Sequence, residues 1–153
     1  MRKPRTSITI LLADDDADDR MITRMALERH RLANDLRFVE DGEELMDYLR
    51  HQGAYRDAAK SPRPGLILLD LNMPRKDGRE ALAEIKDDPK LRSIPVVVLT
   101  TSKAEEDILR SYDLGVNSYI TKPVTFQRLA EVMKALSIYW FEIVRLPNGP
   151  RSA

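Results

Sequence analysis

Three short runs of mostly branched apolar residues, without regular polar alternation, mark the chain. They are Ile8–Leu12, Leu66–Leu69 and Val96–Leu99. Strands with one face in water alternate apolar and polar residues, whereas strands covered on both faces are apolar throughout. The runs therefore predict parallel strands inside a sheet that carries helices on both faces. Weaker strand candidates are Leu36–Val39 and Ser118–Ile120.

Helical periodicity fills the segments between these runs. Helices are predicted over Asp19–Leu32 (with Ile22, Met25, Ala26 and Leu32 on one face), Gly42–Arg50, a segment around Ala81–Ile85 that stops at Asp88-Pro89, a segment opened by the capping box Ser102–Glu105, and a long last helix from about Thr125 past Trp140. The connection from His51 to Pro64 is predicted to be a surface loop. Five strand–helix units in this order predict a doubly wound α/β fold around a five-stranded parallel sheet.

Composition limits the class of protein further. The chain has 153 residues, 25 basic and 25 acidic side chains, and no cysteine. We expect one domain over residues 7–146 with tails at 1–6 and 147–153. Because the charges balance, the protein has no overall electrostatic attraction to nucleic acid or to an anionic membrane. The basic start is followed by an apolar run too short for a signal peptide, and no window suits a membrane span, so we expect a soluble cytoplasmic protein.

Polar residues follow four of the five predicted strands. They are Asp14, Asp15 and Asp16 after the first, Asp70 after the third, Thr100, Thr101 and Ser102 after the fourth, and Lys122 after the fifth. The carboxyl ends of parallel strands meet at one edge of a sheet, where ligands bind. Carboxylates, hydroxyls and one ammonium group should therefore converge there.

Such a cluster suits a hard divalent cation. Neighbouring carboxylates raise one another's pKa, and Mg²⁺ relieves that repulsion through oxygen ligands. With charge neutralised, one carboxylate can attack a phosphorus atom and become an acyl phosphate. A hydroxyl and a lysine nearby could then hold the oxygens of the transferred group.

Five segments in register resemble the response-regulator receiver family of two-component signalling. They are Leu11–Asp16, Leu66–Pro74, Asp77-Gly78, Val97–Thr101 and Tyr119–Pro123. The resemblance spans about residues 7 to 140 and keeps the order of the family's motifs. It implies a phosphorylation switch that works with a sensor histidine kinase, rather than an enzyme.

The resemblance also implies a role for each motif residue. Asp70 would accept the phosphoryl group, and Lys122, followed by a cis peptide bond to Pro123, would contact that group. Thr100 would move its hydroxyl onto the phosphoryl group while Tyr119 rotates inward as the aromatic switch. For Tyr119, simple half-buried packing is the alternative.

The implied metal is Mg²⁺. Asp15 and Asp70 would bind it directly, Asp14 would act mainly through water, and Asn72 would supply its backbone carbonyl. Asp14 stands where many relatives have Glu, so its shorter side chain could change the water bridge.

A finer resemblance points to the small regulators paired with bacterial phytochrome kinases. It rests on the Gly53–Pro64 loop, Pro74–Gly78, Leu99–Ser102 and Tyr139–Phe141, and implies a red-light-sensing kinase as partner and a homodimer. Apolar residues of the last helix exceed one packed face, which favours an interface that includes Val132, Tyr139 and Trp140. The alternative is a helix that wraps its own domain.

Several charged residues are expected to have structural roles only, with no part in the chemistry. Asp18 and Asp19 are interpreted as solvated acids in the first turn of a helix, and Arg75 and Lys76 as solvated cations beside the site. His30 and His51 lie near helix ends and are not expected to act as phosphorelay histidines.

Two other functions share part of this residue pattern. A haloacid-dehalogenase phosphatase needs a second Asp two positions after the nucleophile, and Asn72 stands there. A phosphorylation-independent binding module would not need the full set of motif residues. Too few residues follow the last helix for a DNA-binding module. Output is therefore expected through binding of a partner, a change in association, or onward transfer of the phosphoryl group in a relay.

Overall fold

The computed structural model describes residues 9–29, 35–100 and 118–122 together with residues 116, 127 and 131. The strands are β1 (Thr9–Ala13), β2 (Asp35–Val39), β3 (Leu66–Asp70), β4 (Val96–Thr100) and β5 (Ser118–Thr121). The helices are α1 (Ala17–Arg29), α2 (Gly42–Arg50) and α3 (Gly78–Asp87), with the short 3₁₀ helices η1 (Gly53–Tyr55) and η2 (Ala58–Lys60). The helices predicted after β4 and β5 lie outside the described residues.

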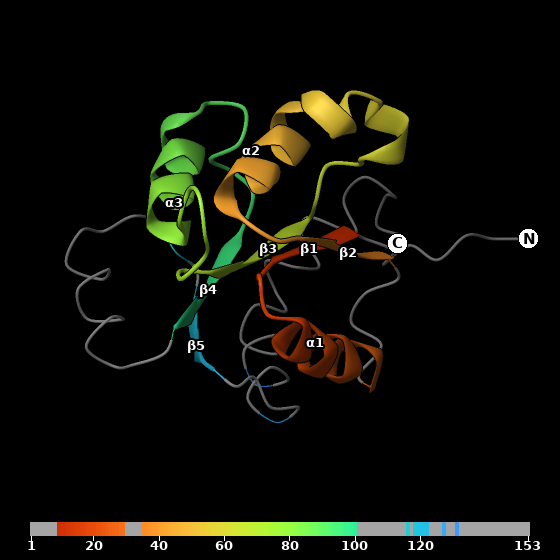
Figure 1. Cartoon of the computed structure of the whole chain (residues 1–153), viewed down its shortest axis with the longest axis vertical. Helices are drawn as coiled ribbons and strands as arrows, with labels where there is room; N and C mark the ends of the chain where they lie inside the picture. Colours follow the sequence, from red (N-terminus) through yellow and green to blue (C-terminus); the bar gives the residue numbers. More distant parts are fainter. Residues whose placement is uncertain are drawn as a thin grey trace, which may run out of the picture.

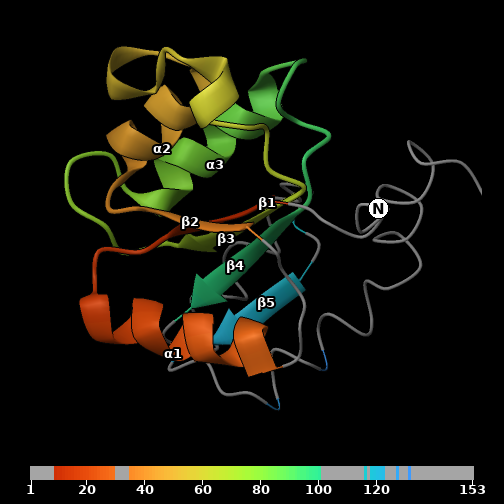
Figure 2. The ribbon, with the colours of Figure 1, turned by 90° about the vertical axis from the view of Figure 1, so that its right-hand side faces the viewer.

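The five strands form one parallel sheet in the order β2-β1-β3-β4-β5. Helix α1 covers one face, and α2 and α3 cover the other (Figures 1 and 2). The predicted doubly wound α/β fold is therefore confirmed. The direction of winding reverses between β1 and β3, the place where open α/β sheets bind ligands.

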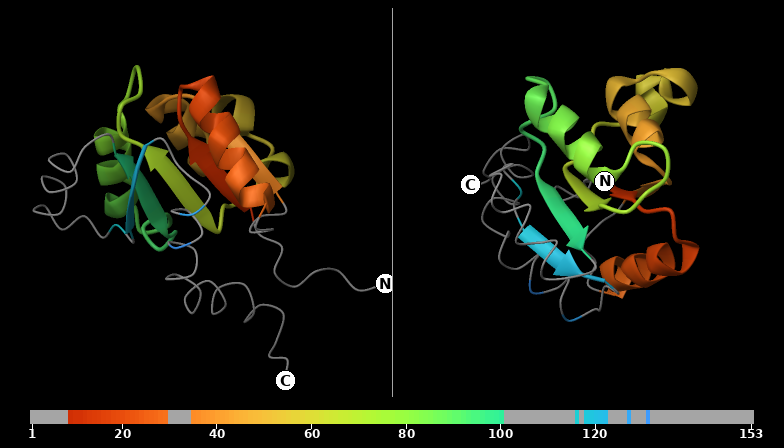
Figure 3. Two further views of the ribbon diagram at one scale, coloured as in Figure 1. Left: turned by 90° about the horizontal axis from the view of Figure 1, so that it is seen from below. Right: turned by 60° about the vertical axis from the view of Figure 1, so that its left-hand side comes forward.

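The sheet has a hydrophobic core on each face. In β1, Leu11 and Ala13 pack into the cluster under α2 and α3, while Ile10 and Leu12 pack into the cluster under α1. All four side chains have 0% exposure. Burial on alternating faces explains why the strands read as continuous apolar runs, and each fully buried leucine or isoleucine contributes about 1.5–3 kcal/mol. Figure 3 shows the two helical layers from two other directions.

The buried face of α1 differs from the predicted one. Met25 is 48% exposed, so its assignment to the buried face is wrong. Thr23 and Leu27, one turn apart, are buried instead, and Ile22 packs at the edge of the same core. The pattern misled because Thr23 is polar, yet its hydroxyl is satisfied by a hydrogen bond to the Asp19 carbonyl at 3.0 Å.

The connection between α2 and β3 is more ordered than a simple surface loop. It contains η1 and η2. Two side chains contact its backbone, one from α2 and one from the residue that caps the C-terminus of α2. The Tyr48 hydroxyl donates to the Pro62 carbonyl at 2.7 Å, and His51 Nε2 lies 2.9 Å from the Ser61 carbonyl. The ring of Tyr55 also packs against that of Tyr48, with centroids 5.1 Å apart.

Candidate functional site

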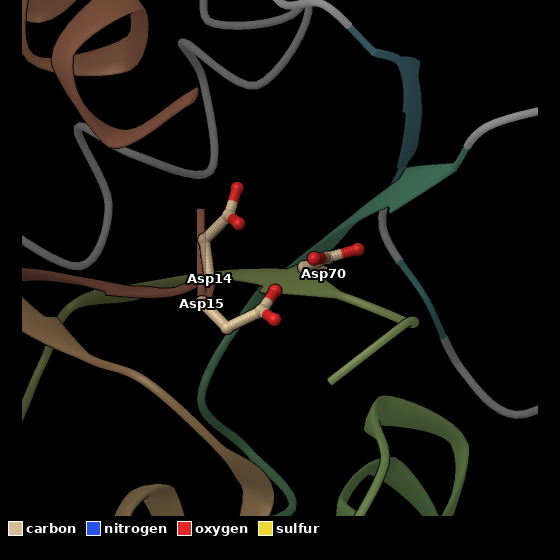
Figure 4. Close-up of side chains that lie close together, drawn as sticks. All are labelled: Asp14, Asp15 and Asp70. Atoms are coloured by element: carbon tan, nitrogen blue, oxygen red, sulfur yellow. The ribbon is translucent and has the colours of Figure 1, made fainter. Parts of the chain in front are cut away.

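Three carboxylates meet at the edge of the sheet where β1 and β3 end. The two strands pair with Ala13 opposite Leu69, so the next residues, Asp14 and Asp70, lie side by side. Together with Asp15 they can offer oxygen atoms that all lie within 4.8 Å of one another (Figure 4). Asp14 and Asp70 are 0% and 1% exposed, whereas Asp15 faces solvent.

The turn after β1 is fixed by its own hydrogen bonds. The Asp14 backbone N–H donates to the Val39 carbonyl at 3.0 Å, and Arg20 Nη1 donates to the Asp14 carbonyl at 2.8 Å. The Asp14 side chain accepts from the Asp16 N–H at 3.0 Å. Asp16 in turn accepts from the first backbone N–H groups of α1, the usual arrangement at a helix N-terminus. These bonds hold the Asp14 carboxylate toward β3.

Asp70 is held equally firmly at the end of β3. Its Oδ1 accepts from the Asn72 N–H at 3.1 Å. Helix α3 begins close above it, because the Gly78 N–H donates to the Leu71 carbonyl at 2.9 Å. A Cβ on Gly78 would lie 2.2 Å from the Asp70 carbonyl oxygen, so this close approach requires glycine.

Lys122 brings the positive charge, from the residue after β5. Its Nζ lies 3.2 Å from Asp70 Oδ2, 3.3 Å from Asp14 Oδ2 and 2.7 Å from Asp19 Oδ2. The predicted convergence of Asp14, Asp70 and Lys122 is therefore present. The interpretation of Asp19 as a merely solvated acid is wrong. No sequence signal separates Asp19 from Asp18, because the contact arises only when α1 packs beside β5.

Burial and charge determine the proton affinities of the cluster. Burial raises the pKa of Asp14 to about 6, the nearby Asp70 charge adds to this effect, and the Asp16 N–H and Lys122 oppose it. Burial likewise raises the pKa of Asp70 above its ordinary value, against the Asn72 N–H and Lys122. Burial works against the Lys122 charge, but the carboxylates of Asp19, Asp70 and Asp14 outweigh it and raise its pKa.

The carboxylate cluster fits a divalent cation. In the described part of the chain, Lys122 is the only cation that lies within 4 Å of the carboxylate oxygens of Asp14 and Asp70. Asp14 Oδ2 is buried and accepts no hydrogen bond there, although Lys122 Nζ lies near it. An unsatisfied buried carboxylate oxygen is costly, and a hard cation would satisfy it.

The structure describes some of the other predicted site residues and leaves others outside the described part of the chain. Thr100 ends β4 opposite Thr121, and the position of its hydroxyl lies outside what the structure describes. Asn72 is exposed. Tyr119 is 6% exposed and packs in the core under α2 and α3. Thr101, Ser102 and Pro123 lie outside the described residues, as do the predicted interface residues Val132, Tyr139 and Trp140.

Arg75 and Lys76, interpreted from the sequence as solvated cations, are paired. Arg75 Nη1 lies 2.6 Å from Asp41 Oδ2, and Lys76 pairs with Glu84. Asp41 caps α2, so the loop that follows Asp70 is tied to the start of that helix. The sequence could not show these pairs because they join elements that meet only in the folded chain.

A doubly wound sheet whose switch point gathers buried carboxylates and a lysine defines an α/β protein with a charged ligand site at the carboxyl ends of its strands. The model of the response regulator receiver domain matches residues 10–134. The chain belongs to the response regulator receiver family and is a signalling switch in which an aspartate accepts a phosphoryl group. The predicted family is thus confirmed, and the signalling interpretation prevails over the phosphatase.

The chain is similar to several response regulators of comparable length. Response regulator Rcp1 of Synechocystis is 46% identical over 138 residues, which is 90% of this chain and 92% of Rcp1. The structure of the bacteriophytochrome response regulator RtBRR superposes with a TM-score of 0.81 at 44% identity, over 87% of this chain and 80% of RtBRR. The structure of the phosphorylated cyanobacterial phytochrome response regulator RcpA superposes with a TM-score of 0.72 at 47% identity, over 88% of this chain and 94% of RcpA. The Mn²⁺-bound form of response regulator Rcp1 superposes with a TM-score of 0.67 at 44% identity, over 88% of this chain and 95% of Rcp1.

None of the described helices is both long enough and apolar enough to cross a bilayer.

Proposed function

We propose that Asp70 takes a phosphoryl group from a phosphohistidine of a sensor kinase and that the receiver, residues 7–146, signals through the resulting change. The observation that carries this proposal is the buried Asp70 carboxylate, 3.2 Å from Lys122 Nζ at the switch point of the sheet. One oxygen of Asp70 is oriented by the Asn72 N–H and the other by Lys122. A carboxylate fixed in this way is ready for in-line attack.

Mg²⁺ is the proposed cofactor. Asp15 and Asp70 would bind it directly, Asp14 mainly through water, and Asn72 through its backbone carbonyl. The bound ion would neutralise the carboxylates and the oxygens of the incoming phosphoryl group. The mutual distance of the carboxylates and the unsatisfied Asp14 Oδ2 support this set. The Mn²⁺-bound form of Rcp1 supports a divalent cation in a close relative.

In the proposed transfer an Asp70 oxygen forms a bond to phosphorus while the P–N bond to the kinase histidine breaks. The electron pair of that bond stays on the histidine nitrogen. Lys122 donates hydrogen bonds to the phosphoryl oxygens, which gain negative charge near it. In the proposed loss of signal, water attacks phosphorus, the bond to Asp70 breaks, and inorganic phosphate leaves.

The conformational switch is assigned to Thr100 and Tyr119. Thr100 ends the strand next to β3, and Tyr119 is buried in β5, the strand next to Thr100. Thr100 follows Leu99, the residue paired with Asp70, and Tyr119 pairs with Val98 on the same strand as Thr100. We propose that the Thr100 hydroxyl moves toward that group and that Tyr119 repacks with it.

The proposed partners are a phytochrome-type histidine kinase and a second copy of the chain, in the cytoplasm and without nucleic acid or membrane. Similarity to RcpA and RtBRR, which their names connect with phytochromes, supports the kinase. The apolar residues Val132, Tyr139 and Trp140 support the dimer. Trp140→Glu should convert a dimer into a monomer in sedimentation equilibrium. A dimer of unchanged stability would place the interface elsewhere.

The central test is phosphorylation by a small donor. Acetyl phosphate with Mg²⁺ should add one phosphoryl group, measured by intact-protein mass spectrometry. Asp70→Asn should abolish the addition because the amide is not a nucleophile. Asp87→Asn, at an exposed position of α3, is the matched control and should label normally. Undiminished labelling of Asp70→Asn would reject the assignment.

A further inference from the structure

The Lys122 ammonium is surrounded by carboxylates of two kinds. Asp14 and Asp70 belong to the cluster that would hold the metal ion and the phosphoryl group, and they lie 3.2–3.4 Å from Nζ. Asp19 belongs to α1 and makes the shortest contact, at 2.7 Å. The Lys122 side chain is 11% exposed and that of Asp19 is 23% exposed, so solvent screens this pair only partly.

The position of Asp19 is itself fixed. Its backbone N–H donates to Asp16 Oδ1 at 3.1 Å, in the capped first turn of α1. Its carbonyl accepts from the Thr23 hydroxyl at 3.0 Å, and Thr23 is fully buried. Asp19 therefore offers Lys122 a carboxylate on a rigid element that takes no part in the proposed metal site.

We propose that Asp19 is a positioning residue that anchors Lys122 for the phosphoryl group. This inference rests on the proposed function of Asp70. An ammonium has three N–H donors. One donor held by Asp19 leaves two free to turn from Asp70 and Asp14 to the phosphoryl oxygens when those form. A lysine side chain loses rotamer entropy when it is ordered, and Asp19 imposes that order before the phosphoryl group arrives.

The opposite role would be competition, in which Asp19 draws Lys122 away from its ligand. The two roles predict opposite signs when the Asp19 charge is removed. An anchor predicts weaker binding of a phosphoryl mimic, whereas a competitor predicts tighter binding. The contacts favour the anchor, because Nζ stays within 3.2 Å of Asp70 Oδ2 while it is bound to Asp19.

The test measures binding of beryllofluoride, a mimic of the phosphoryl group, at saturating Mg²⁺ by ¹⁹F NMR. Asp19→Asn should bind it about fivefold more weakly, the size expected for one lost charged contact that orients a partner. The shift of the bound fluorine nearest Lys122 should also change. Asp19→Glu, which keeps the charge, should restore part of the affinity. Asp18→Asn, one residue earlier, exposed and of equal charge, should behave as wild type.

Mg²⁺ affinity without beryllofluoride and the unfolding midpoint should agree between Asp19→Asn and Asp18→Asn, which separates positioning from a structural role. Equal or tighter beryllofluoride binding by Asp19→Asn would overturn the inference. If Asp19→Asn folds poorly, Asp19→Ser takes its place, and the same measurements of beryllofluoride affinity, Mg²⁺ affinity and unfolding midpoint decide the outcome. Wild-type protein that binds no beryllofluoride, or Asp70→Asn that binds it normally, would reject the proposed function itself, so the two failures are distinguishable.

Discussion

Asp14 and Asp70 stand next to each other at the ends of β1 and β3, and both carboxyl groups are closed off from water. Their closeness follows from the strand register, which no side-chain rearrangement can change. Lys122 offsets only part of the cost of ionising two buried carboxylates, because burial still raises the pKa of both. The arrangement is therefore electrostatically strained in the metal-free protein and becomes favourable when a divalent ion binds.

This strain predicts an unusual pH dependence of stability. The pKa of Asp14 is about 6 in the folded protein against 3.8 as its ordinary value. Between these values the folded state keeps a proton that the unfolded chain has lost. The free energy of unfolding should therefore fall as the pH rises from about 4 through about 6, as measured by urea unfolding in the presence of a chelator.

The raised pKa of Asp70 acts in the same direction. Asp14→Asn should reduce the slope of stability against pH, whereas the exposed Asp18→Asn should not. Saturating Mg²⁺ should restore stability above pH 6 in wild type. A slope that is identical in wild type and Asp14→Asn would contradict this account.

Asp15 is expected to matter for the metal and little for the fold. Its side chain is exposed, yet its carboxylate belongs to the cluster with Asp14 and Asp70. Asp15→Asn should weaken Mg²⁺ binding at least about tenfold, since one charged oxygen ligand is lost. Isothermal titration calorimetry measures this, with Asp18→Asn as control. Mg²⁺ binding that survives Asp15→Asn unchanged would exclude Asp15 as a ligand.

The sequence predicted the sheet and its acidic edge because both depend on strand order alone. Branched apolar runs indicated buried strands, and the residues after them, such as Asp14 and Asp70, had to meet. It did not predict the contact of Asp19 with Lys122, which depends on how α1 packs beside β5. Met25 was misplaced because a buried Thr23 interrupts the apolar stripe of α1. Contacts that depend on how a helix packs against the sheet, such as that of Asp19 with Lys122, thus required the three-dimensional structure.

Gly78 is expected to be indispensable for the geometry around Asp70. A methyl group there would meet the backbone of Asp70 and Leu71 at 2.2 and 2.6 Å. Backbone cannot move aside as a flexible side chain can, so α3 would have to shift. Gly78→Ala should destabilise the protein by about 1–3 kcal/mol and slow acetyl phosphate labelling. Arg79→Ala, the next residue, should change the free energy of unfolding by less than about 1 kcal/mol.

Arg75 combines an ion pair with an unfavourable backbone conformation. Its φ is 62°, in the left-handed region, and its guanidinium reaches Asp41 at 2.6 Å. The Arg75 side chain is 63% exposed, so the pair is worth about 0.2–1 kcal/mol. A residue with a Cβ pays roughly 1 kcal/mol or more in this conformation relative to glycine.

Two substitutions separate these effects. Arg75→Ala loses the ion pair and keeps the backbone strain, so it should lower the free energy of unfolding. Arg75→Gly loses the same pair but relieves the strain, so it should be about 1 kcal/mol more stable than Arg75→Ala. Urea unfolding of both variants measures the difference. Equal stabilities would show that the left-handed conformation of Arg75 carries no strain, and that the ion pair with Asp41 is the whole contribution of this residue.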